Sequence, residues 1–174
     1  YDYISWIAPS LSNQTFEIIV VVKAEHLDQN RTFVSDIYEE VRALDGNWSE
    51  EIPNQDYVRV TFEVPLDSSR DITIYPRALN WTNISGVLID VFEIDGNESI
   101  AQFQNIKEDE YNKIFLDGSS GTGLGNRNQD TFDLLVLNGS LEFDHIVDPE
   151  AGIPPNVTFV GATPANGTTQ NWNS

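Results

Sequence analysis

Apolar and polar residues alternate along much of the middle of the chain, and this alternation predicts β-strands. In residues 57–64 every second side chain is apolar, as Val58, Val60, Phe62 and Val64 show. Pro65 ends the pattern because proline has no N–H for a strand ladder. Shorter strands are expected at residues 72–75, 87–94, 99–103 and 113–116, the middle two joined by a hairpin turn at Asp95-Gly96-Asn97.

Residues 130–149 predict a second hairpin, which turns at Asn138-Gly139 because both residues tolerate the positive φ of a two-residue turn. Such a turn sets the register of its two strands. The expected cross-strand pairs are Val136 with Leu141, Leu134 with Phe143, Phe132 with His145, Leu135 with Glu142 and Asp133 with Asp144. This register places His145 on the apolar side that faces the core.

Two segments near the N-terminus depart from alternation. Phe16–Val22 is a continuous apolar run, typical of a strand that is buried on both faces. No hairpin partner lies beside it in sequence, so we expect it either to complete the local sheet or to insert into a neighbouring subunit. Ser35–Leu44 predicts the one helix, with Ser35 as its N-cap, Gly46 as its C-cap, and an apolar stripe of Val34, Ile37, Val41 and Leu44.

These elements predict a mainly β fold, an antiparallel β-sandwich or jelly-roll-like domain of about eight or nine strands. One short helix and terminal extension strands complete it. Residues 1–50 are interpreted as an N-terminal strand and helix segment, a candidate donor strand, and residues 51–150 as the sandwich. Residues 151–174 read as a Pro-rich linker and the strand of a following module or tail.

Composition and charge exclude or disfavour several classes of function. The chain has 9 Lys and Arg against 28 Asp and Glu, a net charge of −19, which disfavours nucleic acid as a partner. It has no cysteine, which excludes disulfides and cysteine-ligated metals. No apolar run predicts a membrane span, and no signal-peptide pattern opens the chain. We expect any signal or anchor to have been removed or to lie outside this segment.

Glycosylation sequons are strongly over-represented. Nine triplets satisfy Asn-x-Ser/Thr, where roughly two are expected by chance. They begin at Asn13, Asn30, Asn47, Asn80, Asn83, Asn97, Asn138, Asn156 and Asn166. Clustering of Asn, Ser and Thr in turns accounts for part of the excess. The remainder predicts a densely N-glycosylated extracellular protein on a cell surface.

Four segments together resemble parts of the large, repeat-rich cell-surface proteins of archaea. They are SNQTFEIIVVVKAEHLD, DYVRVTFEVPLDSSRDITIYPR, QDTFDLLVLNGSLEFDHIVDP and PPNVTFVGATPANGTTQNW. The resemblance implies a surface location, β-sandwich modules with Ig-like neighbours, and N-glycosylation. It implies no catalytic residues.

Several residues were weighed as sites of chemistry. Asp133 and Asp144, opposite each other in the expected register, would need a cation or an arginine between them unless the register differs or the carboxylates point apart into solvent. No EF-hand loop is present, so no metal or cofactor is expected. His26 and His145 are the two imidazoles. No Gly-x-Ser-x-Gly motif accompanies them, and we expect structural roles for both.

Three further patterns have ordinary explanations. The acidic runs Glu50-Glu51 and Glu108-Asp109-Glu110 suit a glycosidase pair, but they fall in polar connections where burial is not expected. Residues 121–125 are glycine-rich but lack the Lys-Ser/Thr of a phosphate loop, so a flexible loop is expected. Trp48, Trp81 and Trp172 are candidates for stacking on sugars, although the first two lie within sequons, where they would pack under the protein's own glycan.

The sequence thus predicts a structural subunit of an extracellular filament or surface layer on an archaeal cell, not an enzyme. Its expected partners are covalent N-glycans and copies of itself, joined partly by β-strand addition. The alternative is a cell-surface adhesin or glycan-binding module that uses loops and exposed tryptophans.

Overall fold

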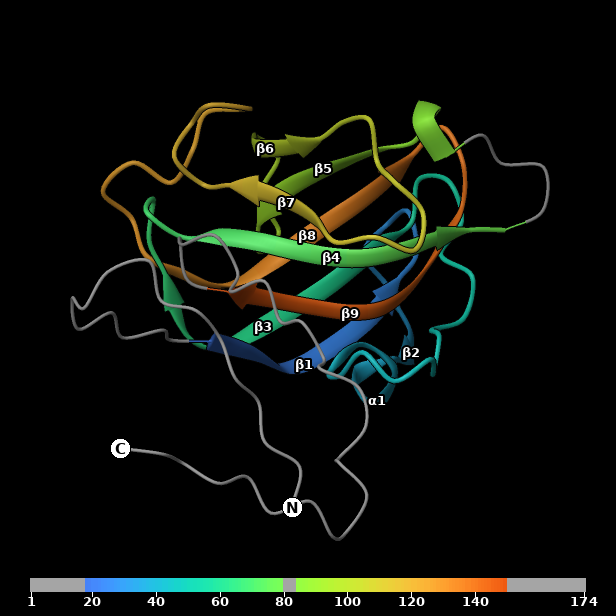
Figure 1. Ribbon diagram of the computed structural model, residues 1–174. Coiled ribbons are helices and arrows are strands. Elements are labelled where there is room, and N and C mark those ends of the chain that lie inside the picture. The colour runs from blue at the N-terminus through green and yellow to red at the C-terminus, as the bar shows by residue number, and fades with distance from the viewer. Residues whose placement is uncertain (1–17, 80–83, 150–174) are drawn as a thin grey trace, which may run out of the picture. The chain divides into compact units, whose positions relative to one another are not determined.

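The computed structural model describes residues 18–79 and 84–149. These residues form nine strands, a one-turn α-helix and a 3-10 helix, so the mainly β prediction is confirmed (Figure 1). In chain order the elements are β1 (Ile18–Leu27), β2 (Phe33–Asp36), α1 (Tyr38–Val41), β3 (Tyr57–Leu66), β4 (Asp71–Ala78), η1 (Ile84–Gly86), β5 (Leu88–Glu93), β6 (Ser99–Phe103), β7 (Asn112–Phe115), β8 (Gln129–Leu137) and β9 (Leu141–Pro149).

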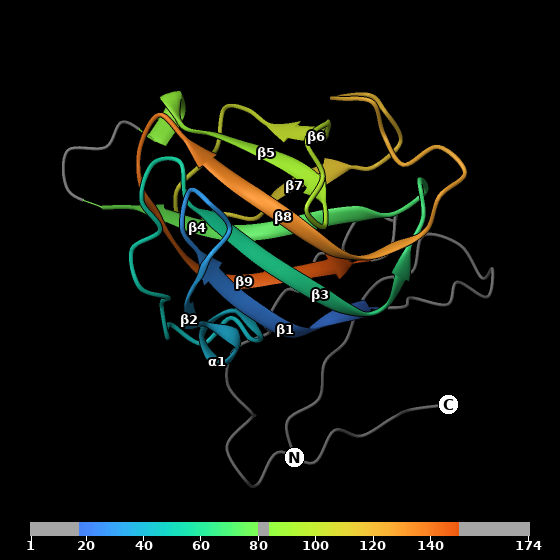
Figure 2. The same cartoon turned by 180° about the vertical axis from the view of Figure 1, so that it is seen from behind.

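The strands pair in the continuous order β6-β5-β8-β3-β1-β9-β4-β7, and β2 pairs with β1. β1 connects two antiparallel layers, because Ile18–Val20 pair with β9 whereas Val21–Leu27 pair with β3. Figure 1 shows β4, β7 and β9 at the front, and Figure 2 shows β3, β5 and β8 on the opposite side. The end strands β6 and β7 are neighbours across the seam between the layers.

The core lies between the two layers and follows the predicted alternation of β3 as far as Phe62, whereas Val64, beyond an irregularity in the pairing with β8, is 42% exposed. On β3, Val58, Val60 and Phe62 are buried while the residues between them are half-exposed. They meet Phe132, Leu134 and Val136 of β8, and the rings of Phe62 and Phe132 pack edge to face at 5.9 Å. Aromatic and branched side chains of this size dominate core stability. The β5–β6 hairpin across residues 95–97 is also confirmed.

The predicted hairpin of residues 130–149 is wrong. Both strands exist, but β8 pairs with β3 and β5, while β9 pairs with β1 and β4 in the other layer. The segment 52–56 takes the place of the expected partner: Gln55 and Asp56 bond Val136, and Ile52 bonds Leu141. Asn138 does adopt a positive φ of 65°. The turn therefore links two layers, and none of the five expected cross-strand pairs forms.

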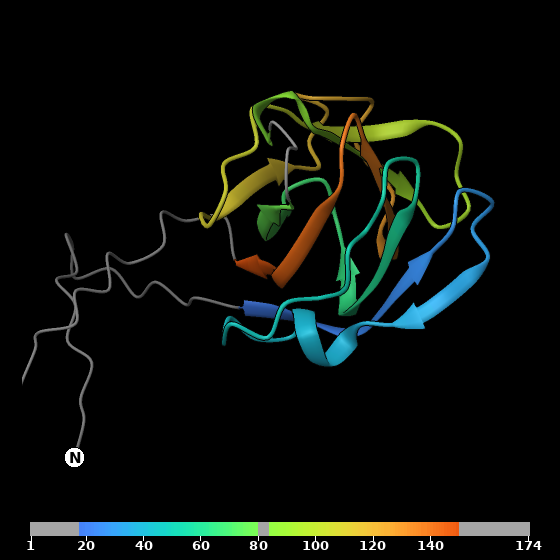
Figure 3. The same cartoon turned by 90° about the vertical axis from the view of Figure 1, so that its right-hand side faces the viewer.

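The predicted helix is shorter than expected. Only Tyr38–Val41 is helical, and the N-cap position is Ile37, with no side-chain cap. Ser35 lies in β2, because residues 33–36 pair with the end of β1 (Figure 3). Of the expected apolar stripe, Ile37 and Val41 are buried, whereas Val34 and Leu44 are exposed. Strand pairing at 33–36 has overridden a short and intrinsically weak helix.

β1 completes its own sheet and is not buried on both faces. Ile19 and Val21 are buried, whereas Ile18, Val20 and Val22 are 63%, 39% and 48% exposed. Of the two destinations considered for this segment, the structure shows the local sheet. Residues 16 and 17, and the expected tail strand in 151–174, lie outside the described residues.

The glycine-rich segment is an ordered cover on the edge of β6. Thr122 and Gly123 donate backbone hydrogen bonds to Ser99 and Ile100. A Cβ on Gly121 would lie 2.4 Å from the Ile100 carbonyl oxygen, so only glycine permits this approach. The segment thus shields a strand edge.

Candidate functional site

A row of aromatic side chains lies on the outer side of β4 and β9. We call it the aromatic face and define it as Trp48, Tyr75, Tyr111 and His145. The ring centroids of Trp48 and Tyr75 are 6.0 Å apart, those of Tyr75 and Tyr111 5.1 Å, and those of Tyr111 and His145 6.0 Å. Tyr111 is 51% exposed, and the other three are half-buried. These rings thus form a continuous surface that remains open to solvent.

The strand register places two of these rings side by side. Tyr75 of β4 pairs directly with His145 of β9, and Arg77 pairs with Glu142 two positions further on. A bulge between these pairs adds Asp144 to β9. The bulge turns the Asp144 carboxylate toward the preceding loop, where it accepts hydrogen bonds from the N–H groups of Asp45 and Gly46.

The loop that carries Trp48 is held firmly against β9. Gly46 adopts a φ of +82°, which favours glycine. The N–H of Ser49 donates to the Phe143 carbonyl at 2.9 Å, and the Ser49 hydroxyl accepts from the Phe143 N–H at 3.0 Å. Trp48 is consequently anchored by its neighbours on both sides.

Two charged side chains border the rings. The Arg77 guanidinium lies 4.2 Å above the centroid of the Trp48 ring, a cation–π contact. Arg77 also forms an ion pair with Glu142. The aromatic face therefore offers apolar ring surfaces, tilted by 40–72° from one ring to the next, and its border adds a carboxylate acceptor and guanidinium donors.

The protonation of Tyr111 and His145 suits a neutral hydrogen bond between them. Burial lowers the pKa of His145 below its usual value, although the nearby Asp144 carboxylate opposes the shift. Burial, followed by the neighbouring Tyr75 and Asp144, raises the pKa of Tyr111. The Tyr111 hydroxyl lies 3.1 Å from His145 Nδ1, and the tautomer of the neutral imidazole sets which of the two atoms donates.

His145 was expected in the core, and the structure places it on the outer side. Trp48 was the one member of the aromatic face proposed as a sugar-stacking residue. Tyr75 and Tyr111 were missed. The period-two alternation around Tyr75 carries a signal that it points outward, whereas nothing in the sequence indicates that Tyr111 reaches it.

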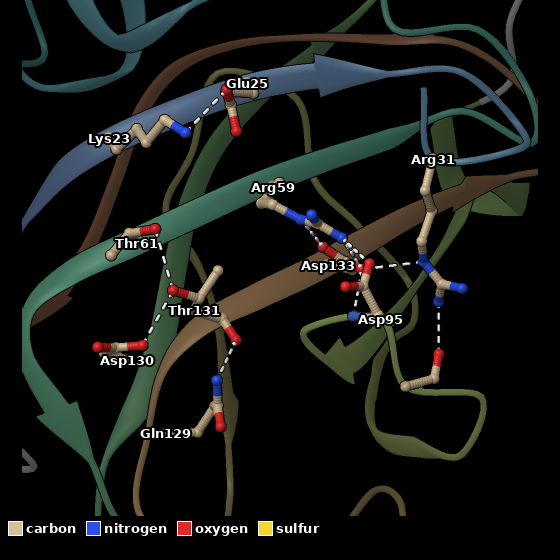
Figure 4. Close-up of polar contacts among 11 residues, drawn as sticks. Lys23, Glu25, Arg31, Arg59, Thr61, Asp95, Gln129, Asp130, Thr131 and Asp133 are labelled. Carbon is tan, nitrogen blue, oxygen red and sulfur yellow. Dashed lines mark hydrogen bonds and ion pairs between the residues drawn. The ribbon is translucent and has the colours of Figure 1, made fainter. Parts of the chain in front are cut away.

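Asp133 does not face Asp144, because the two residues lie on strands that do not pair with each other. It is fully buried on the outer side of β8, where Arg59 donates to it from Nε at 2.6 Å and Arg31 Nε lies 2.9 Å away (Figure 4). The hydrogen bond to Asp133 is the first cause of a raised pKa for Arg59. The register alternative is thus the correct one, because Asp133 and Asp144 lie in different layers and the two arginines pair with Asp133. The cluster ties β8 to β3 and to the β1–β2 turn.

His26 has a structural environment. It is 4% exposed, with Nδ1 2.7 Å from Glu50 Oε1 and Nε2 3.0 Å from Asp56 Oδ2. The Ser35 hydroxyl donates to Glu50 and not to the imidazole, so no Ser-His pair forms. Hydrogen bonds from Ser35 and then His26 lower the pKa of Glu50. The other acidic candidates, Glu51 and Glu108–Glu110, are exposed.

Four of the nine sequon asparagines lie in the described residues, and all four are exposed in connections between elements: Asn30, Asn47, Asn97 and Asn138. Asn13, Asn80, Asn83, Asn156 and Asn166 lie outside those residues, as do Trp81 and Trp172. Glycosylation at all nine stays a prediction.

Within residues 18–79 and 84–149, no group of three or more His, Asp or Glu side chains is arranged to hold a metal ion. No helix in the same ranges is long and apolar enough to cross a membrane.

No protein-family model matches the chain, and no curated protein matches it. Two solved structures are similar in outline. One is the C-terminal domain of a chitobiase from Bacteroides fragilis, with 16% identity, a TM-score of 0.43, and coverage of 85% of this chain and 98% of that one. The other is GH31 CBM32-2 bound to GalNAc, with 14% identity, a TM-score of 0.41, and coverage of 79% and 99%. These values assign no family to the chain.

Proposed function

We propose that this chain is a carbohydrate-binding module of an extracellular, cell-surface protein, and that the aromatic face is its binding site. The observation that carries the proposal is the continuous row of rings from Trp48 to Tyr111 on a solvent-facing sheet. A sugar ring presents a face of C–H bonds that packs on the electron-rich face of an aromatic ring. Its hydroxyl groups need nearby polar partners.

Those partners border the rings. Glu142 accepts hydrogen bonds from hydroxyl groups, and the Arg77 guanidinium donates them. Both are half-buried, and their mutual ion pair holds them in place before a ligand arrives.

The proposal predicts that Trp48→Ala weakens sugar binding by about 10-fold or more, since each ~1.4 kcal/mol of lost contact is a factor of ten. A glycan array identifies the ligand, and calorimetry then measures the affinity. Phe33→Ala is the matched control, because Phe33 is an exposed aromatic residue on β2, outside the aromatic face. Binding that survives Trp48→Ala unchanged, or no saturable binding to any glycan, contradicts the proposal.

A second candidate is the structural subunit that the sequence favours, a module that assembles with copies of itself. The observation in its favour is β2, which pairs with β1 and carries two exposed apolar residues, Phe33 and Val34. An exposed edge of this kind accepts a strand from another chain. The expected donor, residues 16–22, is largely engaged within its own sheet.

A further inference from the structure

A cleft adjoins the aromatic face at Tyr111. This cleft of about 470 Å³ lies at the seam where the end strands β6 and β7 are neighbours. Pockets that hold a small ligand are usually of this size. Tyr111 lines the cleft and also packs edge to face against Tyr75. The cleft and the aromatic face therefore share Tyr111.

The lining of the cleft is rich in lysine, although the chain as a whole is strongly acidic. Its lining includes Lys107 and Lys113, two of the three lysines in a sequence of net charge −19, and no carboxylate. The wall also includes neutral polar groups, among them the amides of Gln102 and Gln104 and the hydroxyl of Ser120. A lysine in the wall of a cleft favours an anionic ligand there when it can exchange its own carboxylate partner for that ligand.

The two lysines are held differently. Lys113 Nζ lies 3.0 Å from the buried carboxylate of Asp71, so most of its charge is already compensated. Lys107 Nζ is 3.3 Å from Glu110, and both side chains are largely exposed, at 70% and 61%. An exposed pair of this kind contributes little to stability. Lys107 is thus available to turn toward a ligand.

Two polar side chains of the cleft wall complete the description of the site. The Ser120 hydroxyl is buried and has no hydrogen-bond partner among the described residues, which is an unusual state for a buried polar group. The side chain of Asn112 bonds the carbonyl groups of Lys107 and Glu110 and the N–H of Lys107. These three bonds fix the turn of residues 107–112, which contains both Lys107 and Tyr111.

We propose that the cleft holds an acidic sugar unit, bearing a carboxylate or a sulfate ester, of the same glycan that lies on the aromatic face. This rests on the proposed carbohydrate-binding function. Lys107 pairs with the anionic group, and the Ser120 hydroxyl donates to it. The aromatic face binds the neutral sugars next to it.

Calorimetry with three oligosaccharides of equal length tests this: a neutral one, one with a uronate unit and one with a sulfated unit. The wild-type protein should prefer at least one acidic ligand by about fivefold or more. Lys107→Gln should remove this preference while neutral binding is retained. Lys23→Gln, a change of equal charge at another exposed lysine, should leave it intact. The uronate and sulfate arms show which group is recognised.

Two failures are distinguishable. Equal affinity for neutral and acidic ligands, or equal effects of Lys107→Gln and Lys23→Gln, overturns the acidic-sugar proposal and leaves the carbohydrate-binding function standing. Absence of binding to all three ligands and to the glycan array overturns both.

Discussion

At the residue scale, single side chains have roles that depend on partners far away in sequence. Asp133 is the clearest case, since Arg59 of β3, Arg31 of the β1–β2 turn and the N–H of Asp95 in the β5–β6 turn all reach its carboxylate. Ser49 belongs to a sequon, and its hydroxyl also bonds the backbone of β9. Ser49 therefore has a structural role in addition to being part of the sequon.

Asp133→Ala should lower the free energy of unfolding by about 3–5 kcal/mol, because it leaves two largely buried guanidinium groups without their shared carboxylate. Asp95 also pairs with Arg59, but its side chain is 69% exposed. Asp95→Ala should therefore cost less than about 1 kcal/mol. Urea unfolding measures both variants. An equal loss of free energy of unfolding in the two variants would contradict the structural role assigned to Asp133.

At the element scale, the strands were largely predictable and their partners were not. Alternation located β3, and turn chemistry located the β5–β6 hairpin, because both signals are local. The pairing of residues 130–149 failed because the segment 52–56 competes for the same backbone groups. The helix at 35–44 failed because residues 33–36 gain strand pairing with β1. The competing partners, residues 52–56 and strand β1, both lie outside the predicted hairpin and the predicted helix.

Self-association, if it occurs, should proceed through the edge of β2. We expect Phe33→Asp to abolish concentration-dependent assembly in sedimentation velocity experiments, since a charge on an exposed edge strand blocks strand addition. Leu44→Asp places the same charge on another exposed apolar residue outside the strands and should leave assembly intact. A wild-type protein that stays monomeric at all concentrations would exclude the structural-subunit candidate at this edge.

At the scale of the whole molecule, the excess of carboxylates makes stability depend on pH. Burial, reinforced by repulsion from Asp71, raises the pKa of Asp148 to about 6. A raised pKa means that the folded state favours the neutral carboxyl. Its contribution to stability is fully present below the unfolded pKa of about 4 and is lost as the pH rises through about 6.

The Asp148→Asn variant should therefore lack that loss between pH 4 and 6.5, and its unfolding midpoint at pH 7 should equal or exceed that of the wild type. Asp67 provides a control of opposite sign, because hydrogen bonds from Ser69 lower its pKa. Asp67→Asn should reduce stability at pH 7, and the difference should vanish as the pH falls below the lowered pKa. Thermal unfolding from pH 3 to 8 measures both. Parallel curves for Asp148→Asn and the wild type would contradict this assignment.

The sequence by itself determined the mainly β class, the alternating core of β3 and the turn at 95–97, because periodicity and turn chemistry are properties of neighbouring residues. It also showed the sequons and the negative charge. Only the tertiary structure decided that β8 and β9 belong to different layers and that Trp48, Tyr75 and Tyr111 share one surface. Rings separated by dozens of residues meet only when a loop is bonded to β9 and β7 pairs with β4. Such contacts arise from long-range pairing, which leaves no local trace in the chain.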